Sequence, residues 1–104
     1  MIMRVYRCTV IAGKEEAHRE FGLRKSHAAL AKQPGLIAFY AGKPLEGSGD
    51  RKRCLVQIWE TLAAIKAMHG DNWDRPSETL PEEARAIYDS VSVEHYELAD
   101  QFKA

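Results

Sequence analysis

The chain has 104 residues, the size of one folding domain, so we expect a single domain over residues 1–104. Hydrophobic residues make up 45% and charged residues 29% of the sequence, which excludes a disordered chain and a collagen-like fibre. Lys plus Arg and Asp plus Glu number 15 each, so no excess of positive charge favours nucleic acid or an anionic membrane surface as a partner.

The first half of the chain alternates between strand-like and helix-like segments. Residues 2–11 interleave polar and apolar side chains and are rich in β-branched residues, which predicts a first strand. Residues 14–32 contain no proline and many Ala, Glu, Leu and Lys residues, which predicts a helix that ends before Pro34-Gly35. Strands over 36–42 and 53–60 follow, separated by a polar loop that contains glycines.

The second half adds a helix, a loop and a final strand. Thr61 is a suitable N-cap for a helix over residues 62–69, and a long loop follows it. Pro81 then starts another short helix, because proline is well tolerated in the first helical turn. Residues 90–98 are predicted as the last strand.

This β-α-β-β-α-β order predicts an α+β, ferredoxin-like sandwich, in which helices cover one face of a four-stranded antiparallel sheet. The opposite face of such a sheet needs its own cover. A second copy of the chain would supply that cover, so we expect a homodimer.

Two further features bear on where the protein works. The longest apolar run, from Leu36 to Ala41, is too short to cross a bilayer, and the N-terminus is predicted as a strand rather than a leader. We therefore expect a cytoplasmic protein without a membrane partner. Cys8 and Cys54 lack the CxxC spacing and lie on predicted strands, which favours reduced, packed thiols over a disulfide or a zinc site.

The predicted first helix has an unusual face. Projected at 100° per residue, its apolar arc includes Phe21 and Leu30, whereas His18 and Gly22 fall on the opposite side. Glu20, Arg24 and His27 fall inside the apolar arc, where aliphatic residues are normal. Either Glu20 and Arg24 form a half-buried ion pair with His27 at its edge, or Arg24 and His27 point into a cavity and bind an oxygen of a small ligand.

The remaining candidate residues are histidines and large aromatics. His69 lies at the C-terminal end of its helix, either as a capping side chain or as a cavity residue. No histidine spacing matches a metal site, so we expect none. Sheet aromatics are core residues in most proteins, but several would converge on one cavity here: Tyr6, Tyr40, Trp59 and Trp73. His95 and Tyr96 point to opposite sheet faces, and periodicity does not decide which of them faces the helices.

The segment Pro34-Gly35-Leu36-Ile37-Ala38-Phe39-Tyr40, the segment Val56-Gln57-Ile58-Trp59-Glu60, and the Ala-rich helix that ends in His69 together resemble the antibiotic biosynthesis monooxygenase (ABM) family. The resemblance spans residues 1–97. It implies a dimeric α+β barrel of ferredoxin-like subunits. The chain departs from the family pattern after this helix. Many members carry a second histidine there, whereas this chain has Gly70-Asp71-Asn72-Trp73.

The resemblance implies cofactor-independent oxygenation of a small aromatic phenol or quinol. We expect His27, His69 or His95 as the base, Arg24 as the cation for the phenolate, and the aromatic residues as a clamp. Haem degradation, which one branch performs, is disfavoured because the first strand has no asparagine. The alternatives are a non-catalytic dimer that binds a small ligand, an uncharacterised stress-related domain, and a purely structural module.

Overall fold

The computed structural model describes residues 1–78 and 80–102 of the chain. Four strands form one antiparallel sheet in the order β2-β3-β1-β4. The strands are β1 (Ile2–Val10), β2 (Leu36–Gly42), β3 (Lys52–Trp59) and β4 (Tyr88–Glu97). This is the ferredoxin-like topology, so the predicted fold class is confirmed.

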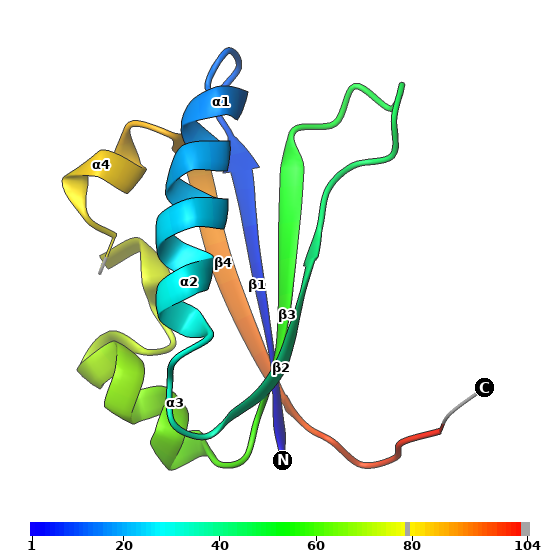
Figure 1. The fold of residues 1–104 in the computed structure, drawn as a ribbon, viewed down its shortest axis with the longest axis vertical. Helices are drawn as coiled ribbons and strands as arrows, with labels where there is room; N and C mark the ends of the chain where they lie inside the picture. The colour runs from blue at the N-terminus through cyan, green and yellow to red at the C-terminus, as the bar shows by residue number, and fades with distance from the viewer. Residues whose placement is uncertain (79, 103–104) are drawn as a thin grey trace.

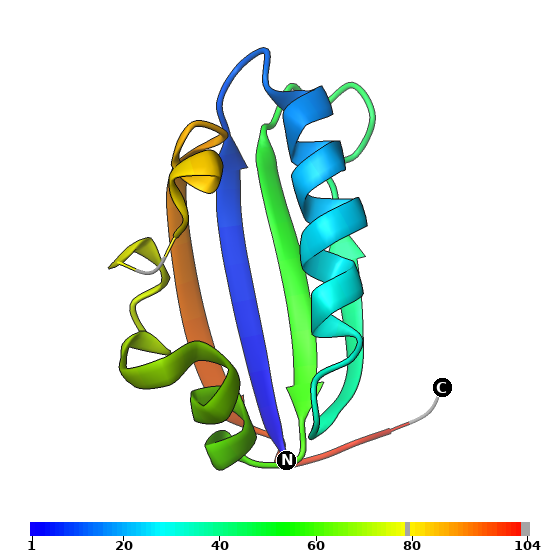
Figure 2. The same ribbon diagram turned by 60° about the vertical axis from the view of Figure 1, so that its left-hand side comes forward.

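The helices all lie on one side of the sheet (Figure 1). They are α1 (Glu15–His18), α2 (His27–Leu30), α3 (Leu62–His69) and α4 (Glu82–Arg85), with 3₁₀ turns at Gly70–Asn72 and Pro76–Glu78. Figure 2 shows the long first helix in front of β3 and β2, whereas α3 and α4 lie in front of β4. The two groups of helices therefore stand on either side of the middle of the sheet.

The long first helix departs from the prediction in its winding. Between α1 and α2, residues Arg19–Ser26 form a π-helix, with hydrogen bonds from residue i to i+5. Each residue of a π-helix turns through a smaller angle than the 100° of an α-helix. The projection at 100° therefore misplaced some residues: Gly22 is buried and His18 is half-buried, whereas Glu20 and Ala28 are exposed. Phe21, His27 and Leu30 do face the sheet, as the projection predicts.

The core lies at the end of the sheet where β3 meets α3. Leu30, Trp59 and Ile65 form its buried centre. The indole Nε1 of Trp59 donates a hydrogen bond to Oε1 of Gln57 at 2.8 Å, which satisfies the one polar atom of the buried ring. Gly35 packs so closely on α3 that an added Cβ would lie 2.6 Å from the Cβ of Ala64. The PG motif thus brings the start of β2 against α3.

Helix α3 forms as its sequence predicts. The Thr61 hydroxyl oxygen accepts a hydrogen bond from the backbone N–H of Ala64 at 3.1 Å, the expected N-cap. Gly70 ends the helix with a φ of 73°, a conformation that favours glycine.

The sheet face opposite the helices is open and largely apolar, and we call it the open face. Strand alternation and register place apolar and aromatic residues on it, among them Met3, Val5, Tyr40, Val56, Ile58 and Tyr96. The side chain of Arg7 forms an ion pair with Glu94 on the same face, and the Tyr96 hydroxyl also donates to Glu94.

Within residues 1–78 and 80–102, no helix is both long enough and apolar enough to cross a bilayer. Both cysteines are free thiols, as their spacing predicts.

Candidate functional site

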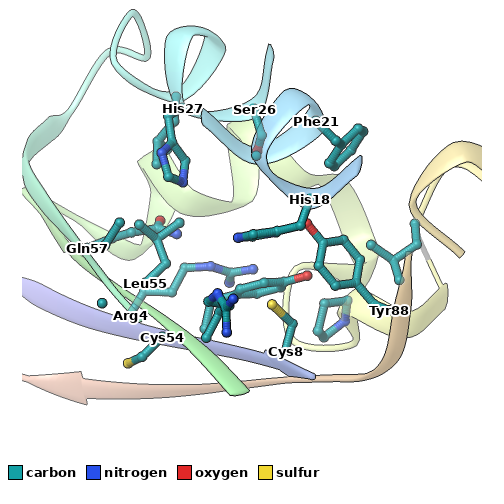
Figure 3. A pocket seen from close by; sticks show the side chains of 18 of the residues that line it. Arg4, Cys8, His18, Phe21, Ser26, His27, Cys54, Leu55, Gln57 and Tyr88 are labelled. Atoms are coloured by element: carbon teal, nitrogen blue, oxygen red, sulfur yellow. The ribbon is translucent and has the colours of Figure 1, made fainter. Parts of the chain in front are cut away.

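A cavity of about 530 Å³ lies between the long helix and the covered face of the sheet. Figure 3 shows helix side chains and sheet side chains converging on it from opposite sides. Its polar lining includes Arg4, Tyr6, Gln57, His18, His27 and His69. Phe21, Leu30, Leu55 and Met68 supply apolar lining. This volume falls in the range of pockets that bind small molecules.

Arg4 is the most unusual residue of the cavity. It is only 2% exposed, although it is a charged side chain on the central strand β1. Its Nη1 donates to the backbone carbonyl of Trp73 and to Nε2 of His95, each at 2.7 Å. Because Arg4 is the donor, His95 accepts at Nε2 and carries its ring proton on Nδ1. Trp73 and His95 therefore orient the guanidinium through two neutral acceptors.

No carboxylate among the described residues forms an ion pair with Arg4, and its Nε is buried without a hydrogen-bond partner. The carboxylate of Asp74 acts on it only at a distance and instead lies 3.7 Å from Arg75. Burial lowers the pKa of Arg4 to about 10, so the side chain still carries its charge at pH 7. The cavity thus contains a buried, uncompensated cation.

The histidines around the cavity are neutral at pH 7. Burial, and to a smaller extent the charge of Arg4, lower the pKa of His69 to about 4. Burial also lowers the pKa of His27, His18 and His95. The Nε2 atom of His69 is buried and has no hydrogen-bond partner among the described residues. A neutral imidazole with a free ring nitrogen can accept a proton from a ligand.

At the other end of the cavity, His18 and Tyr88 face each other (Figure 3). Nδ1 of His18 lies 2.8 Å from the Tyr88 hydroxyl. Burial raises the pKa of both Tyr6 and Tyr88, so both phenols stay protonated at neutral pH. Gly22 makes room for this imidazole, because an added Cβ would lie 3.2 Å from Cε1 of His18.

Arg24, predicted as a cavity residue, lies outside it. Its side chain is 72% exposed and forms an ion pair with Glu20 at 3.2 Å. The Glu20–Arg24 ion pair of the first sequence hypothesis forms, but it is exposed rather than half-buried. His27 lines the cavity instead, as the second hypothesis predicts for that residue. The π-helical winding explains the difference, because it turns Arg24 away from the sheet while His27 still lines the cavity.

The predicted aromatic residues are dispersed rather than gathered. Trp59 is fully buried in the core, and its ring does not line the cavity. Tyr40, which is 66% exposed, and Tyr96, which is 46% exposed, lie on the open face. Trp73 packs edge-on against His95, with ring centroids 4.7 Å apart. Of the two neighbours on β4, His95 is thus the one that faces the helices, and Tyr96 points to the open face.

Sequence reasoning missed Arg4, His18 and Tyr88 as cavity residues, whereas Tyr6 was among the aromatic residues expected to converge there. For Arg4 a signal was present. The ferredoxin-like order places the first strand in the centre of the sheet, and alternation places Arg4 and Tyr6 on one of its faces. Polar side chains at such positions are an anomaly in a purely structural sheet. His18 was missed because the helical projection used the wrong angle.

Among residues 1–78 and 80–102, no group of three or more His, Cys, Asp or Glu residues is arranged to hold a metal ion. Burial raises the pKa of the Cys8 thiol to about 11, so this cavity residue is a protonated, unreactive thiol at pH 7.

No protein-family model and no curated protein sequence matches the chain. Solved structures do match it over nearly its whole length. The haem degrader MhuD from Mycobacterium tuberculosis, with two haems in its active site, is 19% identical with a TM-score of 0.68 over 99% of this chain and 100% of that one. SnoaB, a cofactor-independent oxygenase from Streptomyces nogalater, is 18% identical with a TM-score of 0.71 over 99% and 97%. A candidate antibiotic biosynthesis monooxygenase from Nitrosomonas europaea is 18% identical with a TM-score of 0.70 over 96% and 100%.

These similarities confirm the resemblance to the ABM family at the level of the fold. Folds of this kind host several activities, so function must be argued from the cavity itself.

Proposed function

We propose that the protein is a cofactor-independent monooxygenase of the ABM type that acts on a small aromatic phenol or quinol. The observation that carries this proposal is the buried cation of the cavity, Arg4, beside neutral histidines in a space of ligand size. The neighbouring oxygenase SnoaB and the candidate monooxygenase from Nitrosomonas europaea share the fold and support the same class of reaction.

The proposed chemistry begins with loss of a phenolic proton. An imidazole with a free nitrogen accepts it, and His69, whose buried Nε2 is unpartnered, is the first candidate, with His27 as the second. Because the pKa of His69 is low, this base is weak on its own. The charge of Arg4 compensates, since a nearby cation stabilises a negatively charged substrate in the cavity.

The deprotonated substrate then supplies the electrons. For an anthrol-type substrate, one atom of O₂ enters the ring as a carbonyl oxygen and the other leaves as water, and the ring carbon provides all four electrons. The apolar lining from Phe21, Leu30, Leu55 and Met68 supports this step, because it holds the aromatic rings and excludes water from the reactive intermediate.

We also propose that the protein is a homodimer in the cytoplasm. The support for a dimer is the open face, which carries Met3, Val56 and Ile58 and which none of the helices among residues 1–78 and 80–102 covers. The support for a cytoplasmic location is the pair of free thiols.

A second candidate function is haem binding. Two observations favour it: MhuD shares the fold and binds haem, and the unpartnered Nε2 of His69 is a donor atom that iron accepts. The first strand still lacks the asparagine that the resemblance implies for haem-degrading members, so we rank this function second.

The test is oxygen uptake by the purified, metal-free protein with anthrols, naphthols and hydroquinones, compared with the anaerobic reaction and with a haem titration. We expect saturable uptake by the parent, a loss of at least about 100-fold in kcat/KM in His69→Ala, and an unchanged rate in Arg24→Ala, because Arg24 is a surface residue.

A Soret band that shifts on titration and is lost in His69→Ala, without oxygen uptake from phenols, would select haem binding. Absence of both oxygen uptake and haem binding would leave a non-catalytic ligand-binding or structural dimer.

A further inference from the structure

The cavity wall has an imbalance of charge that the fold does not correct. Four cationic residues line it, namely Arg4, Arg19, Lys43 and Arg53, against one acid, Glu15. Three of the four cations lie on exposed or half-exposed positions, where water screens them. Arg4 does not, because it is 2% exposed.

A buried cation without an anion is costly for a folded protein. Arginine cannot escape this cost by losing its proton at neutral pH. Buried charges are therefore normally paired with an opposite charge or fully hydrogen-bonded. Arg4 has neither arrangement: one nitrogen, Nη1, has two neutral acceptors, and Nε has none.

The arrangement around Nη1 explains how the side chain is held. The carbonyl of Trp73 and the ring of His95 fix Nη1, and Trp73 packs against that same imidazole. The guanidinium is thus held in one orientation at the cavity without being neutralised. Arginine presents a planar fork of N–H groups that matches the two oxygens of a carboxylate.

We propose that the natural ligand of the cavity is an aromatic compound that carries a permanent carboxylate, and that this carboxylate pairs with Arg4. The inference rests on the proposed function in placing an aromatic ligand in this cavity, and it narrows the substrate class from neutral phenols to aromatic acids. Arg4 then anchors the acid group, while the apolar residues of the cavity contact the rings.

The test compares two ligands of the same shape, 2-naphthoate and naphthalene-2-carboxamide, which differ in charge. Isothermal titration calorimetry measures both dissociation constants for the parent, Arg4→Gln, Arg4→Lys and Arg85→Gln. Arg85 is an exposed arginine on α4 and serves as the matched control. We expect the parent and Arg85→Gln to bind 2-naphthoate at least about tenfold more tightly than the carboxamide. A ratio of this size corresponds to the free energy of one charge-assisted hydrogen bond.

In Arg4→Gln the two ligands should bind equally, and Arg4→Lys, which keeps the charge but loses the fork, should retain part of the preference. Equal binding by the parent, no binding of 2-naphthoate at millimolar concentration, or a preference that survives in Arg4→Gln would each overturn the proposal.

A second measurement covers the case in which Arg4→Gln does not fold. The Nε–H group of Arg4 is buried and gives its own signal in a ¹⁵N-edited NMR spectrum, identified by its loss in Arg4→Lys. We expect 2-naphthoate, and not the carboxamide, to shift this signal. A signal that both ligands move equally, or that neither moves, contradicts the pairing.

Neither ligand has a phenolic group to oxidise, so the result does not depend on turnover. Binding of 2-naphthoate with no oxygen uptake from any phenol would support the acid site and refute the oxygenase. Oxygen uptake from neutral quinols, with no preference for 2-naphthoate over the carboxamide in binding, would support the oxygenase and refute the acid site.

Discussion

Strand β1 carries two arginines three residues apart, and the two faces of the sheet treat them differently. Arg7 lies on the open face, where its half-exposed side chain pairs with Glu94. Arg4 lies on the covered face, where it is buried and has no carboxylate partner within the described residues. The fold therefore neutralises the arginine that water already screens, and it leaves unpaired the arginine that is almost entirely buried.

The difference separates a structural side chain from a candidate functional one. An exposed ion pair such as Arg7–Glu94 contributes little to stability and is easily lost or gained. A buried cation is tolerated only where something else requires it. Two arginines on the same strand thus have different roles, and the burial and pairing of each side chain distinguish the structural residue from the candidate functional one.

The largest expected effect follows from replacing Arg4. Arg4→Met should weaken 2-naphthoate binding by about 10- to 100-fold, yet change the free energy of unfolding by less than about 1 kcal/mol, because losing an unpaired buried charge offsets the lost hydrogen bonds. Calorimetry and urea unfolding measure the two quantities. Arg7→Met is the matched variant on the open face and should leave binding unchanged; equal losses in both variants would remove the distinction between the faces.

On the open face, Val56→Glu should convert the proposed homodimer into a monomer. The substitution places a charge at the centre of the apolar surface, beside Val5 on the adjacent strand, and we expect the dimer dissociation constant to rise at least about tenfold. Sedimentation velocity measures this. Glu60→Gln, at an exposed position beyond the end of β3, is the control. A parent that sediments as a monomer would show that the open face has another partner or none.

The free energy of unfolding should fall in acid because of His69, which lines the cavity on the covered face of the sheet. His69 has a folded-state pKa of about 4, below its unfolded value, so the unfolded chain binds more protons between these two values and stability is lost as the pH falls through that window. After allowance for partial solvent screening, we expect His69 to contribute roughly 1 kcal/mol of this loss. His69→Gln should show a shallower decline in urea midpoint from pH 6.5 to pH 4.5 than the parent does. An identical decline would mean that His69 is protonated in the folded protein.

The smallest expected effect concerns Gly22. An alanine at this position gains helix propensity, but its Cβ would lie 3.2 Å from the ring of His18. We expect Gly22→Ala to displace His18 from Tyr88 and to lower oxygenase activity several-fold, with no gain in thermal stability. Ala28→Gly, at an exposed position of the same helix, controls for helix propensity. Full activity in Gly22→Ala would show that the position of His18 does not matter for turnover.

Local sequence signals predicted the fold well and the cavity poorly. Helix α3 was predicted with its N-cap, Thr61, and its terminal glycine, because capping depends on residues a few positions apart. His27 and His69 line the cavity, which is one of the two alternatives that the sequence left open for each of them. Arg24 does not line it, because the π-helical winding changes which side chains face the sheet, and no local pattern in the sequence indicated this winding.

The sequence by itself determined the order of the elements, the ferredoxin-like topology and the presence of polar side chains on both the first strand and the first helix. These features follow from periodicity, breakers and caps, which act over a few residues. Only the tertiary structure decided that Arg4 is buried without a carboxylate and that Arg7 is paired with Glu94. Burial and pairing depend on which distant segments cover each sheet face, because the cost of a charge is set by its three-dimensional surroundings.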